Sequence, residues 1–178
     1  APPHLRRPER AGSRLLLMDG DGDPGVAPTP AHELDAIEAV IDGWLEAEQA
    51  SNPVIAAVDR GEPGQRRWYV RLSGEEKATF TVWFTLGQRT LHHETYVLPA
   101  PEENHAAVFE QLLRRNRDMY GVAFVVGDED AIYLVGRLAN ESVTRDELDR
   151  ILGSVYAYVE RAFRPALHLA FASHFAEG

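Results

Sequence analysis

The spacing of apolar residues along the chain predicts a helix followed by three strands. Apolar residues recur at helical spacing from position 34 to position 45, behind Thr29 as helix N-cap and Pro30 at the first helical position. After a short apolar link at 54–58, three runs alternate between apolar and polar positions, as strand residues do. These runs are 67–73, 78–86 and 89–98, with a two-residue loop, Gly87-Gln88, between the last two. The pattern predicts a three-stranded antiparallel meander.

A second helix and two more strands are expected after the meander. The helix is expected from about Pro101 to Arg117, because the acidic residues 102–103 near its start and the arginines near its end suit the helix dipole. Its predicted buried stripe consists of Val108, Phe109, Leu112 and Leu113. Two strands then flank an acidic turn, at 122–126 and 131–137.

A long third helix completes the predicted fold. Thr144 and Glu147 form a capping box at its start, and Pro165 is expected to kink or interrupt it. Its predicted apolar face consists of Leu148, Ile151, Leu152, Val155, Val159, Ala162 and Phe163. The element order is therefore α-β-β-β-α-β-β-α, which predicts an α+β fold with a five-stranded antiparallel sheet.

The first thirty residues differ in composition from the rest of the chain. They are rich in proline and glycine, so we expect residues 1–30 to be a tail and residues 31–178 to be a single domain. The tail contains an apolar island, Leu15–Met18, that could dock on the body or on a partner. The aspartates that follow imitate the start of a calcium loop, but Pro24 stands where such a loop requires glycine. This favours a turn-rich linker.

The charge and the absence of cysteine narrow the classes of function. The net charge of −10 repels nucleic acid at long range. A cysteine count of 0 excludes disulfides, thiolate zinc sites and cysteine nucleophiles. No apolar run has the length of a signal peptide core or a membrane span. We therefore expect a cytoplasmic protein without a nucleic-acid or membrane partner.

Two histidines and a glutamate are adjacent in the third predicted strand. Side chains of a strand point alternately to its two faces, so His92 and Glu94 share one face and His93 points to the other. The two histidines cannot bind one ion, and His168 and His174 fall on different faces of a predicted helix. The acidic run 128–130 is expected to be a solvated hairpin tip. We expect neither a metal nor another cofactor.

The sequence carries no recognisable catalytic motif. It contains no G-x-S-x-G elbow, no G-x-G-x-x-G after a strand and no P-loop. A hydrolase would need a nucleophile, a base and oxyanion donors that converge in a cleft. We therefore expect that the protein is not an enzyme.

The predicted second strand carries a tryptophan on the face away from the core. One face consists of large apolar residues, and the opposite face places Trp83 among threonines. The neighbouring strands could add either Tyr69, Arg67 and Arg71 or His92, Glu94 and Tyr96. Trp83 is then either a cross-strand packing residue or an anchor for a partner or second subunit, because Trp, Tyr and Arg dominate interface hot spots.

Several stretches resemble the YbjN-domain family of bacterial proteins. They include WYVRLSGEEKATFTVWFTLG, LHHETYVLPAPEEN, FEQLLRRN, AFVVGDEDAIYLVGRL and VTRDELDRILGSVY, and the likeness spans about residues 31–175. Its most specific pieces are PEEN, LLRRN, YLVGRL and DELDRILG. The resemblance implies the fold of type III secretion chaperones, a single α+β domain in which helices cover one side of an antiparallel sheet.

The resemblance also implies a sensory-transduction regulator or a chaperone-like protein, and it supplies no catalytic residues. Secretion chaperones of this fold are small, acidic dimers that hold an extended partner segment. The leading hypothesis is therefore a noncatalytic chaperone-like or adaptor domain, expected to be a homodimer. It would bind a protein segment through Trp83, Tyr69 and Tyr96, with Arg67 and Arg71 on the polar rim. The alternative is a regulatory domain that senses a small molecule in an enclosed apolar pocket.

Overall fold

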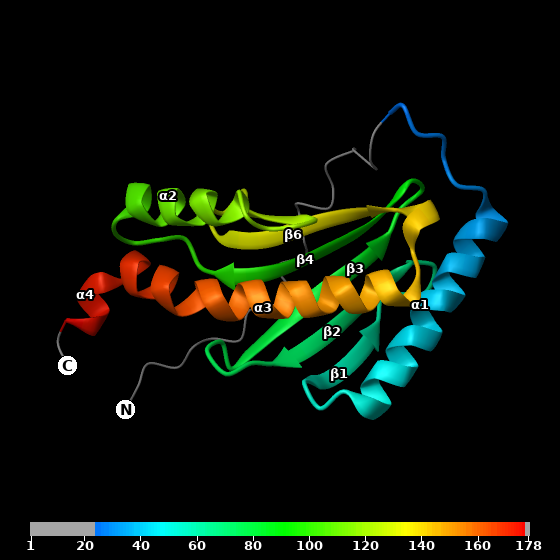
Figure 1. Ribbon diagram of the computed structural model, residues 1–178, viewed down its shortest axis with the longest axis horizontal. Coiled ribbons are helices and arrows are strands. Elements are labelled where there is room, and N and C mark those ends of the chain that lie inside the picture. The colour runs from blue at the N-terminus through cyan, green and yellow to red at the C-terminus, as the bar shows by residue number, and fades with distance from the viewer. Residues whose placement is uncertain (1–23, 177–178) are drawn as a thin grey trace.

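The computed structural model describes residues 24–176, which form one antiparallel sheet covered by helices (Figure 1). The long helix α3 lies across the strands, with α1 and α2 beside it on the same side (Figure 1). The elements in chain order are α1 (Ala31–Ser51), β1 (Ile55–Arg60), β2 (Arg67–Ser73), β3 (Thr79–Leu86), β4 (Thr90–Leu98), α2 (His105–Asn116), β5 (Val122–Val126), β6 (Ile132–Ala139), the short 3-10 helix η2 (Asn140–Ser142), α3 (Arg145–Ala170) and α4 (Ala172–Phe175).

The sheet has six strands in the order β1-β2-β3-β4-β6-β5, and all neighbours are antiparallel. The prediction of five strands was wrong, because the apolar link at 54–58 belongs largely to β1, which pairs with β2. The β3–β4 turn also lies one residue later than predicted. Leu86 pairs with Leu91 and the Gly87 amide donates to the Thr90 carbonyl, which leaves Gln88 and Arg89 as the turn residues.

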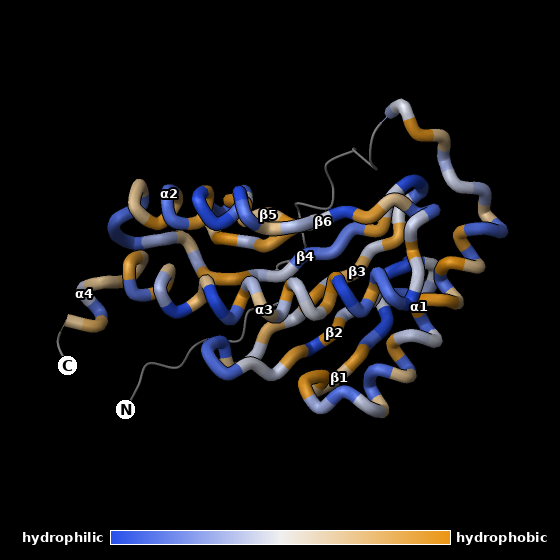
Figure 2. The backbone as a smooth tube through the Cα atoms, viewed as in Figure 1, coloured by the Kyte–Doolittle hydropathy of each residue, from blue (hydrophilic) through white to orange (hydrophobic). Residues whose placement is uncertain are grey.

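The core lies between the helices and one face of the sheet. Hydrophobic and hydrophilic residues alternate along the strands and helices (Figure 2), so each element has one face suited to burial. Trp68, Phe84 and Ile151 are each at most 1% exposed. The predicted apolar faces of β3 and α3 are confirmed, with Phe163 only partly buried.

The second helix is shorter than predicted, beginning at His105 rather than Pro101. The backbone amides of Glu102 and Glu103 both donate to the Ala170 carbonyl at 3.0 Å, so these acidic residues tie the chain to the end of α3. The predicted buried stripe holds for Val108 and Leu112, whereas Leu113 is 65% exposed.

The helix starts were predicted with mixed success. Pro30 stands at the N-cap of α1 rather than inside it, and the Thr29 hydroxyl accepts a hydrogen bond from Asn140 instead of capping the helix. At α3 the Thr144 hydroxyl accepts from the Glu147 amide as predicted, at 3.2 Å. The helix continues past Pro165 and ends at Ala170, which places His168 and His174 in different helices. No helix in residues 24–176 combines the length and apolar character needed to cross a bilayer.

Candidate functional site

The strand register assembles three rows of side chains on the face of the sheet opposite the helices, here called the outer face. The central row runs across the strands through Asp59, Tyr69, Trp83, Glu94, Val135 and Ala123. The basic row contains Arg67, Thr85, His92 and Arg137. The aromatic row contains Tyr96, Tyr133 and Val125. Because the residues alternating with these form the core under the helices, the three rows face away from it.

All five residues predicted to bind a partner lie on the outer face. Tyr69 pairs with Trp83, Arg67 with Thr85 and Arg71 with Thr81. The sequence left open which set of neighbours joins Trp83. The structure brings both sets onto its face, because β3 lies between β2 and β4.

Trp83 differs from the other two tryptophans in its surroundings. Trp44 and Trp68 are 2% and 1% exposed, and their indole N–H groups donate to Asp149 and Asp42. Trp83 is only half-buried, on a face that α1, α2 and α3 leave uncovered. Its ring is therefore available for a contact that the core tryptophans cannot make.

The basic row, together with Arg71 on the other side of the central row, gives the outer face cationic groups within a chain of net charge −10. Arg67 donates from Nε to the Thr85 hydroxyl at 3.2 Å. Arg71 and Arg137 are exposed, and no salt bridge within residues 24–176 involves either guanidinium. The outer face can therefore accept carboxylates beside its aromatic rings.

The tyrosines of the aromatic row are held by the hairpin that follows β5. The rings of Tyr96 and Tyr133 meet edge to face, with centroids 5.6 Å apart. The Tyr133 hydroxyl donates to the Glu129 carboxylate, so the predicted acidic tip is more than a solvated turn. Burial and Glu129 both raise the pKa of Tyr133 and of Tyr96, which keeps both phenols neutral.

Lys77 covers the same corner of the sheet from the β2–β3 loop. Its Nζ donates to the Val97 carbonyl at 2.8 Å and lies 5.4 Å from the Tyr96 ring centroid and 4.7 Å from that of Phe163. Burial lowers the pKa of Lys77 to about 8. The ammonium thus helps to fix the position of Tyr96 through cation–π attraction.

The two adjacent histidines point to opposite faces, as the strand geometry predicts. His92 lies in the basic row, whereas His93 is on the core side at 2% exposure. Neither ring nitrogen of His93 has a hydrogen-bond partner within residues 24–176. Burial, with a smaller contribution from Arg150, lowers the pKa of His93 to about 4. His93 is therefore a neutral core residue at physiological pH.

No cluster in the described part of the chain suits a metal ion. Residues 24–176 contain no group of three or more His, Asp or Glu side chains placed to ligate one. The aspartates that imitate a calcium loop, at 19–23, lie outside the described residues.

The described surface also has hollows that open to solvent. One of about 510 Å³ runs along α2 beside Phe109 and Leu113. A second, of about 270 Å³, lies between α1 and α3 beside Leu152 and Gly153. A small-molecule sensor needs an enclosed apolar pocket with convergent polar groups, and these open hollows do not have that form.

Several of the motif stretches form joints between elements. In PEEN, Glu103 accepts from the Ser173 amide at 2.9 Å and Asn104 donates to the Leu169 carbonyl at 3.0 Å. In LLRRN, the Asn116 amide group exchanges two hydrogen bonds with the backbone of Phe124, at 2.7 and 3.1 Å. In DELDRILG, Asp149 accepts from the Trp44 indole at 2.6 Å. These residues hold the helices and β5 in place behind the outer face.

The sequence model of a bacterial family covers most of the described domain. The YbjN model, described as "Putative bacterial sensory transduction regulator", matches residues 38–168. The chain belongs to the YbjN family. This YbjN protein is 40% identical over 140 residues to "Uncharacterized protein Rv0487" of Mycobacterium tuberculosis, across 79% of this chain and 75% of that protein. It is 37% identical over 127 residues to "Uncharacterized protein ML2442" of Mycobacterium leprae, across 71% of this chain and 69% of the relative.

A solved structure shares the fold of this YbjN protein at low sequence identity. The ExsC–ExsE complex matches with a TM-score of 0.52 and 16% identity, covering 74% of this chain and 93% of that chain. The Yersinia pestis type III secretion chaperone SycH, in complex with a stable fragment of YscM2, matches with a TM-score of 0.46 and 11% identity, covering 69% and 96%. The α+β fold is thus similar to that of the matched chain of the ExsC–ExsE complex.

Proposed function

We propose that this YbjN-family protein is a noncatalytic, chaperone-like adaptor that binds a partner segment on the outer face of its sheet. The observation that carries the proposal is the central row, in which half-buried Trp83 stands opposite Tyr69 on a face that the helices leave open. Tyr96 lies on the neighbouring strand β4, and Arg71, which forms no salt bridge within residues 24–176, lies at the rim.

The composition of this face suits protein recognition. Desolvation of Trp and Tyr rings supplies most of the energy at interface hot spots, and arginines at the rim orient the partner. The similar structure with the higher TM-score is a complex of ExsC with ExsE. The proposal is consistent with the family description as a regulator, since an adaptor can regulate by holding its partner.

The first expected result is that Trp83→Ala weakens partner retention about tenfold or more, because truncation of an aromatic hot spot costs about 2 kcal/mol. The tagged protein is recovered from its native host, and the partners that it retains are identified by mass spectrometry and remeasured with the variant. Phe175→Ala is the matched control, since it removes an exposed aromatic side chain from α4, outside the outer face. Equal loss in both variants, or retention unchanged in Trp83→Ala, would show that the outer face is ordinary sheet packing.

We also propose that the protein is a homodimer that pairs through its α2–β5 edge, defined by Leu113, Tyr120 and Val126. These side chains are 65%, 70% and 47% exposed, and β5 is an edge strand of the sheet. The same face of a second copy supplies matching apolar groups under two-fold symmetry. The backbone of Phe124 in β5 already exchanges hydrogen bonds with the Asn116 side chain, so the second copy would meet this edge through side chains.

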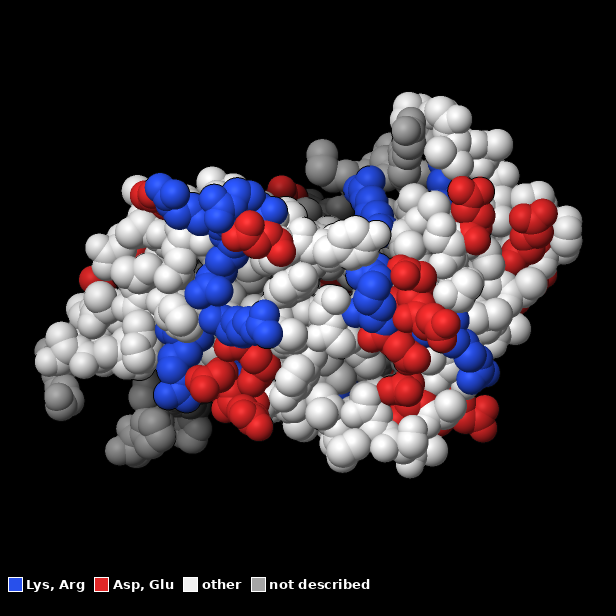
Figure 3. Space-filling model, viewed as in Figure 1, with Lys and Arg blue, Asp and Glu red and all other residues white. Residues whose placement is uncertain are grey.

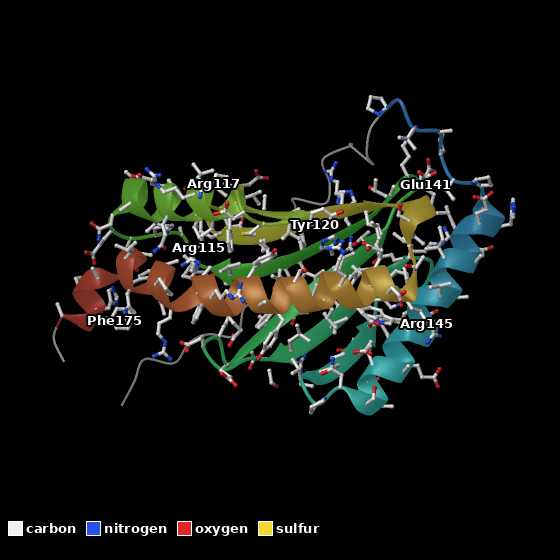
Figure 4. The ribbon with its side chains drawn as sticks, in the orientation of Figure 1. Arg115, Arg117, Tyr120, Glu141, Arg145 and Phe175 are labelled. Atoms are coloured by element: carbon white, nitrogen blue, oxygen red, sulfur yellow. The ribbon has the colours of Figure 1, made fainter. Side chains whose placement is uncertain are left out.

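The charges near this edge are largely balanced within each copy. Figure 3 shows Lys and Arg gathered over α2 and the adjoining part of α3, and Figure 4 shows Arg117 near the end of α2. Arg114 pairs with Glu110 at 2.6 Å and Arg117 with Asp118 at 3.0 Å. This local pairing reduces the repulsion between two copies.

For the dimer, the expected result is that Leu113→Glu converts the protein to a monomer in sedimentation equilibrium. The introduced carboxylate would be buried against its own symmetry mate, which is costly. Phe175→Glu is the control, because Phe175 is 49% exposed on α4, away from the edge. A monomeric wild type, or a dimer that survives Leu113→Glu, would refute this part of the proposal.

A further inference from the structure

The first described residues are fixed beside the β3–β4 turn, next to the basic row. The Thr29 amide donates to the Gln88 carbonyl at 2.7 Å, and Arg89 donates from Nε to the Val26 carbonyl at 2.6 Å. Figure 1 shows this stretch beside the end of the sheet where β3 turns into β4. The basic-row members Thr85 and His92 lie within three residues of that turn. The chain therefore enters the described fold at the basic end of the outer face.

The sequence just before this anchor complements the outer face. Residues 15–18 are Leu-Leu-Leu-Met, and carboxylates follow at Asp19, Asp21 and Asp23. From Val26 toward the N-terminus, the sequence contains three carboxylates and then four apolar side chains. Read away from the turn, the outer face presents the basic row and then the rows that contain Trp83 and Tyr96. The order of charge and apolar character is the same in both.

We propose that residues 15–23 of this chain bind its own outer face, with the aspartates at the basic row and Leu15–Met18 over Trp83 and Tyr69. The segment then acts as a built-in competitor that an external partner must displace. The inference uses the same face as the proposed function but does not require that an external partner exists.

The reach of the chain permits this placement. The ten residues from 15 to 24 can span at most about 35 Å when extended. Successive rows on the outer face are two residues apart along a strand, which is about 7 Å. A segment anchored at Val26 can therefore reach all three rows.

The protein with residues 1–178 offers a direct optical test, because Trp83 is the only one of its three tryptophans outside the core. Acrylamide, a neutral quencher, reports the accessibility of Trp83 while Trp44 and Trp68 stay protected. We expect Leu15→Ser/Leu16→Ser/Leu17→Ser to raise the quenching constant about twofold or more. Asp19→Asn/Asp21→Asn/Asp23→Asn should also raise the quenching constant. The increase should be smaller in high salt, because salt already screens the charge contacts of the wild type.

The controls separate this inference from the proposed function. Trp83→Phe in each background shows that the change in quenching comes from residue 83. A wild-type quenching constant that does not vary with protein concentration supports binding within one chain. If the leucine substitutions leave quenching unchanged, residues 15–23 do not bind the outer face, even if Trp83→Ala still abolishes partner retention. The converse result is that the leucine substitutions increase quenching while Trp83→Ala leaves partner retention unchanged. That result supports binding of residues 15–23 to the outer face and refutes the outer face as the site for an external partner.

Discussion

Gly136→Ala is expected to destabilise the folded protein by about 3 kcal/mol, at the upper end of the usual cost of overpacking a core. Gly136 lies opposite His93 in the β4–β6 ladder. A Cβ atom at position 136 would lie 2.2 Å from Nε2 of His93 and 2.4 Å from the carbonyl oxygen of Gly121. The imidazole has little room to move because it packs beside Phe84 in the core. Urea unfolding monitored by circular dichroism measures the loss.

Gly153→Ala is the matched control for this prediction. Gly153 lies within α3, and a Cβ there would meet no atom within 4 Å. Alanine is favoured over glycine inside a helix, so this variant is expected to gain about 1 kcal/mol. Adding His93→Ala to Gly136→Ala should recover only part of the loss, because the clash with the Gly121 backbone remains. If Gly136→Ala unfolds at the wild-type urea concentration, the packing described around His93 is wrong.

His93 should make the fold begin to lose stability at a pH above the range in which carboxylates titrate. Burial lowers the pKa of His93 from 6.5 to about 4 in the folded state. Between these values the unfolded chain binds the proton more readily than the folded chain, so stability falls as the pH drops from about 6.5 to about 4. At 1.36 kcal/mol per pKa unit, this group removes about 3 kcal/mol across that window.

The comparison with His93→Leu isolates this contribution from other titrating groups. Leucine keeps an apolar side chain of similar size and cannot be protonated. The stability of the variant minus that of the wild type should therefore rise by about 3 kcal/mol between pH 7 and pH 4. His32→Gln, which replaces a histidine whose side chain is 83% exposed, is the control for the loss of a histidine outside the core. A difference between His93→Leu and wild type that stays constant with pH would contradict the buried, unpaired imidazole.

Elements with strong periodicity could be predicted from the sequence. The limits of β2 and β5 are the predicted ones, and the Thr144 cap and the apolar face of α3 are also as predicted. The strand β1 was missed because it is a short edge strand with little alternation in burial, so its pattern resembles that of a link. The start of α2 was placed too early because Glu102 and Glu103 stabilise the end of α3 and not the helix that follows.

The candidate site could be predicted only in part. The alternation around Trp83 correctly gave its face, and the five expected residues share that face. The sequence did not indicate that β6 pairs with β4, because α2 and β5 lie between them in the chain. Tyr133, Val135 and Arg137 were therefore missing from the predicted set. No local signal marks such a long-range pairing, although the alternation in YLVGRL places these three residues on one face of their strand.

Covalent footprinting of the Leu15→Ser/Leu16→Ser/Leu17→Ser variant, in which the proposed internal competitor is removed, with and without the recovered partner tests the account most directly. Hydroxyl radicals modify exposed aromatic side chains, and mass spectrometry then gives the rate of modification at each residue. We expect binding to protect Trp83, Tyr69 and Tyr96 on the outer face and to leave Tyr120 on the α2–β5 edge unchanged. Protection of Tyr120 with undiminished modification of Trp83 would place the partner elsewhere and contradict the outer face as the binding surface.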